Sequence, residues 1–163
     1  MITCGIRRHA SAVLLLLWIP AAHYLPAQTT DLSKIKSFAE SQHEIVKILI
    51  DTKKFNEAAQ EANKIFQMKW PDDQEPVLLR ELLVFSDQFL LYKQNALALQ
   101  LLETNLPMFK TAKSKASIWK EKGYLLEKMG QHEKALECFR EAQRLEKVED
   151  SSPAAARPPA QKK

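Results

Sequence analysis

The sequence predicts an all-α fold in which three antiparallel helical hairpins are stacked side by side. Only three of the 163 residues are Gly, and the chain is rich in Leu, Ala, Lys, Glu and Gln, which favour helix. Apolar residues recur at steps of three and four throughout residues 28–148, as they do on one face of a helix. Turn signals divide this region into pairs of helices joined by short connections, so paired helices are expected to be antiparallel.

Residues 1–27 are expected to be a secretory signal peptide rather than part of this fold. A basic start at residues 7–9 is followed by an apolar run, residues 10–22, and then by a Pro- and Ala-rich segment. That run of about 13 residues is shorter than the roughly 20 that cross a bilayer as a helix. Cleavage after Ala22 or Ala27 would release a secreted or periplasmic protein. An uncleaved membrane anchor is the alternative.

The charge balance gives no reason to expect a nucleic-acid partner. Arg7 and Arg8 lie in the expected signal peptide, so the rest of the chain holds 22 of the 24 basic residues against 20 acidic ones. The sequence has no basic run interleaved with aromatic residues, which is the usual mark of a nucleic-acid surface. We expect an evenly charged, solvated surface.

The first hairpin is expected within residues 31–70. Asp31 can cap a helix that runs to about Thr52, and a turn at residues 53–56 leads into the second helix. The apolar stripe of the first helix is expected to consist of Leu32, Ile35, Phe38, Ile45, Val46, Ile48 and Leu49.

A connector rich in Pro and Asp, residues 70–76, separates the first hairpin from the second. The second hairpin is expected within residues 76–106, with one helix over about 77–91 and the other over about 96–104. Pro ends one helix and can begin the next, which is why the boundary is placed here.

The third hairpin, residues 110–147, has the clearest pattern. On its first helix Trp119, Gly123 and Leu126 share one face, and on its second helix Ala135, Phe139 and Ala142 do the same. The small side chains of Gly123 and Ala135 allow the two backbones to approach closely. Gly130 lies between the helices, where a helix end needs a residue with positive φ.

This third hairpin resembles the tetratricopeptide repeat, a helical hairpin of about 34 residues. The matching residues, in order and spacing, are Trp119, Gly123, Gly130, Ala135, Phe139 and Ala142. The departures are Lys122 where the family prefers Leu, Tyr124 lying two residues before the usual aromatic position at Leu126, and Lys147 where Pro is common. The resemblance implies three repeats that form a short right-handed superhelix. A generic irregular helical bundle is the alternative fold.

Small residues place the other two hairpins in the same register. Ala58 and Ala98 take the place of Ala135, at intervals of 40 and 37 residues whose surplus falls at the connectors. The remaining equivalent positions are Gln42, Val46, Ala62 and Ile65 in the first hairpin and Leu82, Ser86, Phe89 and Leu102 in the second. Close contact at the three alanines is expected to turn separate hairpins into one stack.

The sequence contains no motif for catalysis or metal binding. His43 and His132 fall in different hairpins, and neither has a Cys or Glu at ligand-like spacing on the same helix face. A phosphate-binding Gly-rich loop, a nucleophile elbow and an HExxH motif are all missing from the sequence. We therefore expect a protein that is not an enzyme and that needs no cofactor or metal.

In the family that the third hairpin resembles, the first helices of the repeats line a concave groove that binds a peptide or helix of a partner protein. The groove residues expected here are His43, Lys47, Arg80, Leu83, Val84, Asp87, Lys120, Tyr124 and Glu127. Basic groups at both ends, with Leu83 and Val84 between them, suit a ligand with acidic and apolar positions.

One branch of that family grips the C-terminal carboxylate of heat-shock proteins, and its residue set is not present here. Lys47 and Val84 stand where Asn is expected, and Ser117 and Glu121 replace the last basic pair. The resemblance therefore implies a different protein ligand.

The end of the chain offers a second interaction surface. The last helix runs directly into a Pro-, Ala- and Lys-rich tail, residues 149–163, which is expected to be disordered. Leu136, Leu145 and Val148 should stay partly uncovered, so we expect self-association or partner docking there. Cys138, the one cysteine left after leader removal, is expected to be a half-buried residue, with a reactive or intermolecular thiol as the alternative.

The function that these features favour is a non-catalytic interaction module in a secreted or periplasmic protein. Two alternatives stay open. One is a membrane-anchored assembly factor held by residues 10–27. The other is a cytosolic three-repeat chaperone that resembles those of type III secretion systems.

Overall fold

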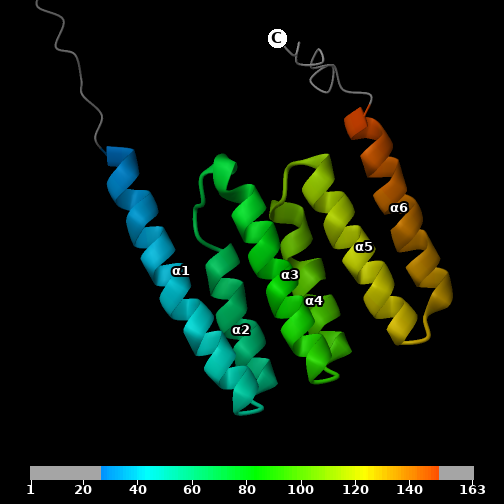
Figure 1. The fold of residues 1–163 in the computed structure, drawn as a ribbon, viewed down its shortest axis with the longest axis horizontal. Coiled ribbons are helices and arrows are strands. Elements are labelled where there is room, and N and C mark those ends of the chain that lie inside the picture. Colours follow the sequence, from blue (N-terminus) through cyan, green and yellow to red (C-terminus); the bar gives the residue numbers. More distant parts are fainter. Residues whose placement is uncertain (1–26, 151–163) are drawn as a thin grey trace, which may run out of the picture.

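The computed structural model describes residues 27–150, and within this region it forms six α-helices without a strand. The helices are α1 (Ala27–Asp51), α2 (Phe55–Phe66), α3 (Glu75–Leu91), α4 (Asn95–Asn105), α5 (Ala112–Lys128) and α6 (His132–Asp150). They pair into three antiparallel hairpins that lie side by side in chain order. The three hairpin turns lie along the same edge of the stack, at the bottom of Figure 1. The predicted all-α fold is confirmed.

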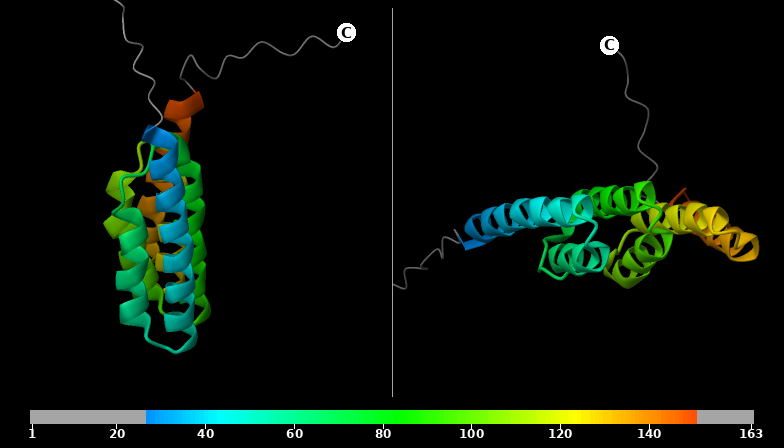
Figure 2. Two further views of the ribbon diagram at one scale, coloured as in Figure 1. Left: turned by 90° about the vertical axis from the view of Figure 1, so that its left-hand side faces the viewer. Right: turned by 90° about the horizontal axis from the view of Figure 1, so that it is seen from below.

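The helices lie in two layers, which Figure 2 shows from two directions. Helices α1 and α3 occupy one layer, and α2 and α4 occupy the other. Neighbouring hairpins contact each other within layers, as α2 with α4 and α3 with α5, and between layers, as α4 with α5. One contiguous core therefore runs through the first two hairpins and extends to Ile118 and Leu125 of α5, and a smaller cluster in the third hairpin packs against Leu99 of α4.

Two helix ends differ from expectation. Helix α1 begins at Ala27, four residues before Asp31, so Asp31 lies inside the helix rather than capping it. Helix α6 continues through Asp150, into the first two residues of the predicted disordered tail. The rest of that tail and residues 1–26, which include the apolar run, lie outside the described region. No helix of residues 27–150 has both the length and the hydropathy to span a bilayer.

The three hairpin turns share one backbone geometry. In each, the residue two positions after the first helix has a positive φ: Lys53 (63°), Lys93 (62°) and Gly130 (74°). At the last turn the N–H of Gln131 donates to the carbonyl of Leu126 at 2.8 Å, and the N–H of Gly130 donates to that of Glu127 at 2.9 Å. The other two turns make the same pair of bonds. This is the Schellman arrangement, which satisfies the last carbonyls of a helix.

The predicted close contacts within the hairpins are confirmed. Ala58 and Ala98 are fully buried and Ala135 is 3% exposed. A Cβ added at Gly123 would lie 2.6 Å from the ring of Phe139, far inside van der Waals contact. A side chain at this position would have to displace the ring of Phe139, which fills the space that a Cβ would take.

The apolar stripe predicted for α1 is only partly correct. Val46 is buried, as is Ile50, which the stripe did not include. Phe38, Ile45 and Ile48 are instead 47%, 42% and 59% exposed. Their spacing places these three residues on one flank of α1. In Figure 1 no other helix of the described region lies on the outer side of α1, whereas Val46 belongs to the core that α1 shares with α2. Helical periodicity identified the apolar residues but not which flank has a neighbour.

The junction between the first and second hairpins is mostly apolar. The ring of Phe66 on α2 meets that of Phe85 on α3 edge to face, with centroids 6.5 Å apart. In the second-helix layer, the side-chain amide of Asn105 donates to that of Asn63 at 2.8 Å. Asn105 is buried, so this bond satisfies a polar group that would otherwise be costly to bury.

The junction between the second and third hairpins contains two buried charged residues, one of which is Glu75 at the start of α3. The Glu75 carboxylate accepts hydrogen bonds from the backbone N–H groups of Lys110 (2.9 Å) and Thr111 (3.1 Å) and from the Thr111 hydroxyl (2.6 Å). Burial alone would raise the pKa of Glu75, but these hydrogen bonds, with one from Ser114, outweigh it and lower the pKa to about 2. Since Thr111 caps α5, this carboxylate joins the start of α3 to the start of α5.

The second buried charge is Lys122, which departs from the family pattern. Its ammonium lies 3.1 Å from a carboxylate oxygen of Glu103 on α4 and 4.3 Å from the ring centroid of Trp119. The lysine thus fills an apolar position with its stem and directs its charge to an acid of the preceding hairpin.

Candidate functional site

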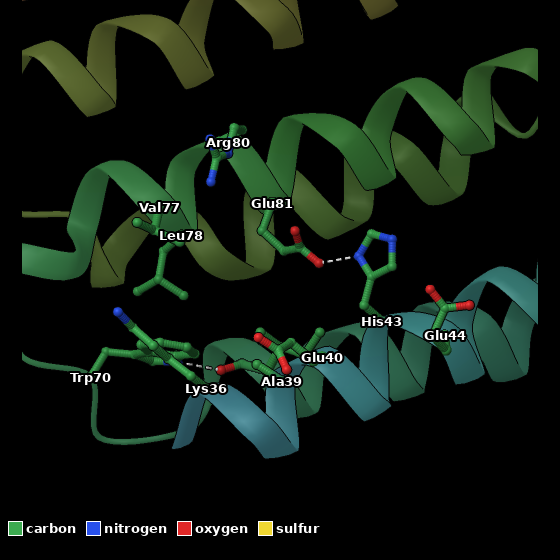
Figure 3. A pocket seen from close by; sticks show the side chains of 11 residues that line it. Lys36, Ala39, Glu40, His43, Glu44, Trp70, Val77, Leu78, Arg80 and Glu81 are labelled. Carbon is green, nitrogen blue, oxygen red and sulfur yellow. Dashed lines mark hydrogen bonds and ion pairs between the residues drawn. The ribbon is translucent and has the colours of Figure 1, made fainter. Parts of the chain in front are cut away.

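A pocket of about 480 Å³ lies between α1 and α3, the first helices of two successive hairpins (Figure 3). Ile65 and Leu78, both buried, contribute apolar surface, and Trp70 of the connector forms part of the wall. Charged residues from both helices line the rest of it: Lys36, Glu40 and Glu44 from α1, and Arg80 and Glu81 from α3. The pocket can therefore hold an apolar side chain within a charged surround.

Two contacts fix the walls of this pocket. The Nδ1 atom of His43 on α1 contacts a carboxylate oxygen of Glu81 on α3, and the imidazole also packs on Phe85 with ring centroids 5.2 Å apart. The indole N–H of Trp70 donates to the carbonyl of Ile65 at 2.7 Å. Because these side chains are held in place, the pocket is formed before any ligand enters it.

A second pocket, of about 570 Å³, lies between α3 and α5. Its carboxylates are Asp87 on α3 and Glu121 and Glu127 on α5, and the basic groups near them are Lys128 and His132. Burial raises the pKa of Glu121 and the negative charge of Asp87 raises it further, whereas the Ser86 hydroxyl and Lys128 oppose the shift. Carboxylates that repel one another in a small space favour a cationic ligand group.

Tyr124 also lines this second pocket and gives it an apolar surface. Its ring is 52% exposed and packs edge to face on Phe139, with centroids 5.2 Å apart. A tyrosine held in this way presents its other face to a ligand at little entropic cost.

Of the nine predicted groove residues, two line the first pocket, three line the second, and four line neither. His43 and Arg80 line the first pocket, and Asp87, Tyr124 and Glu127 line the second. Leu83 and Val84 are half-buried on α3, in the sequence between Arg80 and Asp87, and line neither pocket.

The two predicted groove lysines lie outside both pockets. Lys47 is exposed and lies 3.8 Å from Glu44 on its own helix, a weak surface pair. Lys120 pairs with Glu146 of α6, and this pairing raises the pKa of the lysine. Each of these lysines thus has a carboxylate near its ammonium, and neither lines a pocket beside α3.

Sequence reasoning missed the residues that connect the helices. Trp70 follows α2 in a connector, and its only signal is an aromatic side chain next to Pro71. Val77 and Leu78 were placed on the helix that became α3, but nothing in the periodicity shows that they face α1 across a pocket. Such placements depend on how the connector returns the chain.

Cys138 matches its expected structural role. It lies on α6 and is buried in a cluster with Leu126 and Ala135, and burial raises the pKa of its thiol while Lys122 partly opposes the shift. A buried thiol with a raised pKa has little thiolate available for reaction. Among residues 27–150 no group of three His, Cys, Asp or Glu side chains is placed to hold a metal ion.

Comparison with known families locates the repeat in the third hairpin. The family model of the tetratricopeptide repeat matches residues 116–147, which comprise most of α5 and α6. No curated protein and no solved structure matches the chain.

Proposed function

We propose that this tetratricopeptide repeat protein is a non-catalytic module that binds a peptide or helix of a partner protein along α1, α3 and α5. The repeat at residues 116–147 is of a kind that mediates protein–protein interaction. The two pockets beside α3 support this role, because both open between first helices of successive hairpins.

The spacing of the pockets suits a short segment. Arg80 at the first and Asp87 at the second are seven residues apart on α3. Seven residues are two turns of helix, or roughly 10 Å along the axis. A ligand that reaches both pockets therefore needs about three residues of extended chain, or two turns of its own helix.

The side chains that line the pockets define what the segment carries. The first pocket offers apolar surface from Ile65 and Leu78 for one apolar anchor residue. The second offers Asp87, Glu121 and Glu127 to a basic residue. We therefore propose a ligand with an apolar anchor and a basic residue, in place of the acidic segment that Lys47 and Lys120 suggested.

A displayed library of random peptides, selected on the purified protein, tests this proposal. Selected peptides should share an apolar and a basic position about three residues apart if extended, or about seven if helical. Glu127→Lys should weaken binding of such a peptide by about tenfold or more, because it replaces attraction with repulsion. Glu57→Lys, the same charge change on the second helix layer, should leave binding unchanged. Acidic consensus peptides sensitive to Lys47→Glu and Lys120→Glu would instead favour the acidic ligand.

The apolar pocket has its own matched pair of variants. Val77→Glu places a charge in the pocket lining, whereas Leu91→Glu changes an exposed apolar residue on the same helix that lines neither of the two pockets. Binding lost in the first variant and kept in the second supports the apolar anchor. Equal affinity in both variants would contradict it.

We further propose that the protein is secreted or periplasmic. The basic, apolar and Pro/Ala-rich order of residues 1–27 supports this location. N-terminal sequencing of the fractionated protein should find a chain that starts after Ala22 or Ala27. An intact membrane-bound chain would favour the membrane-anchored assembly factor, and an intact cytosolic chain would favour the secretion chaperone.

Helix α6 supports a second docking role. Leu136 and Val148 are exposed and Leu145 is half-buried, as predicted for the end of the stack. We propose that this surface docks another protein molecule. Leu145→Glu should then lower the mass of the assembly in solution, and an unchanged mass would argue against docking through α6.

A further inference from the structure

We propose that the two ends of the stack are complementary, so that α6 of one copy docks on α1 of a second copy and continues the stack. This inference rests on the docking role proposed for α6 and adds the surface that receives it. It does not involve the pockets beside α3.

The receiving surface is the exposed apolar flank of α1, formed by Phe38, Ile45 and Ile48. These residues follow one another at intervals of seven and three, so they lie along one side of the helix. Each is more than two-fifths exposed. Three large apolar side chains exposed together on one helix flank mark an interaction surface rather than an ordinary solvated face.

The repeat register shows what such a flank does elsewhere in the molecule. Ile45 corresponds to Phe85 in α3 and to Lys122 in α5, at the 40- and 37-residue intervals of the repeats. Both are buried, and both contact the preceding hairpin: Phe85 meets Phe66 of α2, and Lys122 pairs with Glu103 of α4. The flank of α1 is therefore the surface that a preceding hairpin covers, and residues 27–150 contain no such hairpin.

The other end of the stack presents the matching half of this junction. Leu136 on α6 corresponds to Leu99 on α4. Leu99 packs against the cluster of Leu126, Ala135 and Cys138, so at this position α4 covers the next hairpin. Leu136 is 49% exposed because no fourth hairpin follows it in the described region. A second copy supplies the missing hairpin.

Charge at the junction favours the α1 flank as the surface that receives α6. Between the second and third hairpins, Glu103 of α4 pairs with Lys122. The residue of α6 in the register of Glu103 is Arg140, which would repel a lysine at that position. On α1 the residue in the register of Lys122 is Ile45. It has no charge and can pack on the aliphatic stem of Arg140. The exposed surface of α6 is therefore complementary to α1, and not to a helix that carries a lysine at this position, as α5 does.

Such an interface joins two different surfaces, so each added copy leaves one free surface of each kind. The assembly should lengthen with protein concentration rather than stop at a symmetric dimer.

Two variants, each blocking one surface, test the proposal. Ile45→Glu blocks the receiving flank and Leu136→Glu blocks α6, while Leu91→Glu changes an exposed apolar residue away from both ends. Sedimentation velocity on the full chain should show the mass of the wild type and of Leu91→Glu rising at least twofold with concentration. Each blocked variant alone should be a monomer. An equimolar mixture of the two should form a 1:1 dimer and nothing larger, because one intact surface of each kind remains.

The other outcomes are distinct. A mixture that stays monomeric, or either blocked variant assembling like the wild type, overturns head-to-tail stacking. If only Leu136→Glu abolishes assembly, docking through α6 stands and its acceptor is not α1. A wild type that is monomeric at every concentration overturns this inference and self-association through α6 together. Circular dichroism checks that each variant keeps the helical content of the wild type.

Discussion

The first and third hairpins differ in which of their two helices carries the larger side chain where the helices pack against each other. In the first, Val46 on the first helix stands opposite Ala62 on the second, and both are fully buried. In the third, the equivalent positions are Gly123 and Phe139, and the ring occupies the space that the missing side chain leaves. The second hairpin, with Ser86 and Leu102, lies between the two. Close packing requires that the space be filled, but it does not require which helix fills it.

This difference bears on the comparison with known families, in which the tetratricopeptide repeat model matches the third hairpin. The repeat pattern has a small residue on the first helix and an aromatic one on the second, which Gly123 and Phe139 satisfy. Val46 with Ala62 satisfies the same packing need with the sizes exchanged. A comparison that treats each position separately cannot see a property that belongs to the pair.

The largest expected effect comes from exchanging the pairs. Gly123→Val should destabilise the protein by about 3 kcal/mol or more, because its side chain would overlap the ring of Phe139. Phe139→Ala should also cost about 3 kcal/mol, through the cavity that it leaves. The double variant recreates the pair of the first hairpin and should recover at least about 1 kcal/mol relative to the sum of the two costs. Denaturant unfolding of all three variants measures this recovery.

The reciprocal exchange in the first hairpin, Val46→Gly with Ala62→Phe, is the matched control. It should show the same sign of coupling between the two sites. Costs that simply add in both hairpins would show that the positions are independent, and the volume argument would then be wrong.

The next largest expected effect is the loss of a buried carboxylate, which should matter more between the second and third hairpins than between the first and second. Glu75→Gln removes the charge that ties α3 to the start of α5, and it should cost about 3 kcal/mol at neutral pH. That figure is an upper estimate from the fall of the pKa from 4.5 to about 2. Since the folded pKa is the lower one, the contribution is complete above pH 4.5 and is lost as the pH falls from there towards 2.

Unfolding of the wild type and of Glu75→Gln at a series of pH values measures this loss. The two curves should converge as the pH falls below about 4.5. Glu81→Gln at the first junction is the comparison, since its partner His43 is partly solvated and the variant should cost only about 0.5 kcal/mol. A constant difference between wild type and Glu75→Gln down to pH 2 would contradict the role given to the carboxylate.

The smallest effect concerns the hairpin turns, whose geometry is shared but whose residues differ. Gly130→Ala should cost about 1 kcal/mol, because its φ of 74° disfavours any residue with a Cβ. Lys93→Gly should stabilise the second hairpin by about 0.5 kcal/mol, since relief of the left-handed conformation is partly offset by the freedom of glycine in the unfolded chain. Thermal unfolding resolves both changes. A destabilised Lys93→Gly variant would show that the lysine side chain itself contributes to the turn.

Much of the candidate site could be predicted from the sequence because its residues lie on regular helices. His43, Arg80, Asp87, Tyr124 and Glu127 were assigned to one layer from the positions of the small residues, and the structure places them at the two pockets of that layer. Trp70 was not assigned, because a connector has no periodicity from which its direction could be inferred. Lys120 was expected as a basic residue of the groove, and its pairing with Glu146, 26 residues further along the chain, was not foreseen.

What the sequence alone determined is local: the helices, the turn at Gly130, and the buried faces at Ala58, Ala98 and Ala135. Each follows from spacings of a few residues, because helix geometry repeats every 3.6 residues. What the tertiary structure decided is which flank of each helix has a neighbour. Val46 is buried and the adjacent Ile45 is exposed, although both are apolar and β-branched. The difference arises because α2 covers one flank of α1 and no helix of the described region covers the other, and only the assembled stack determines this.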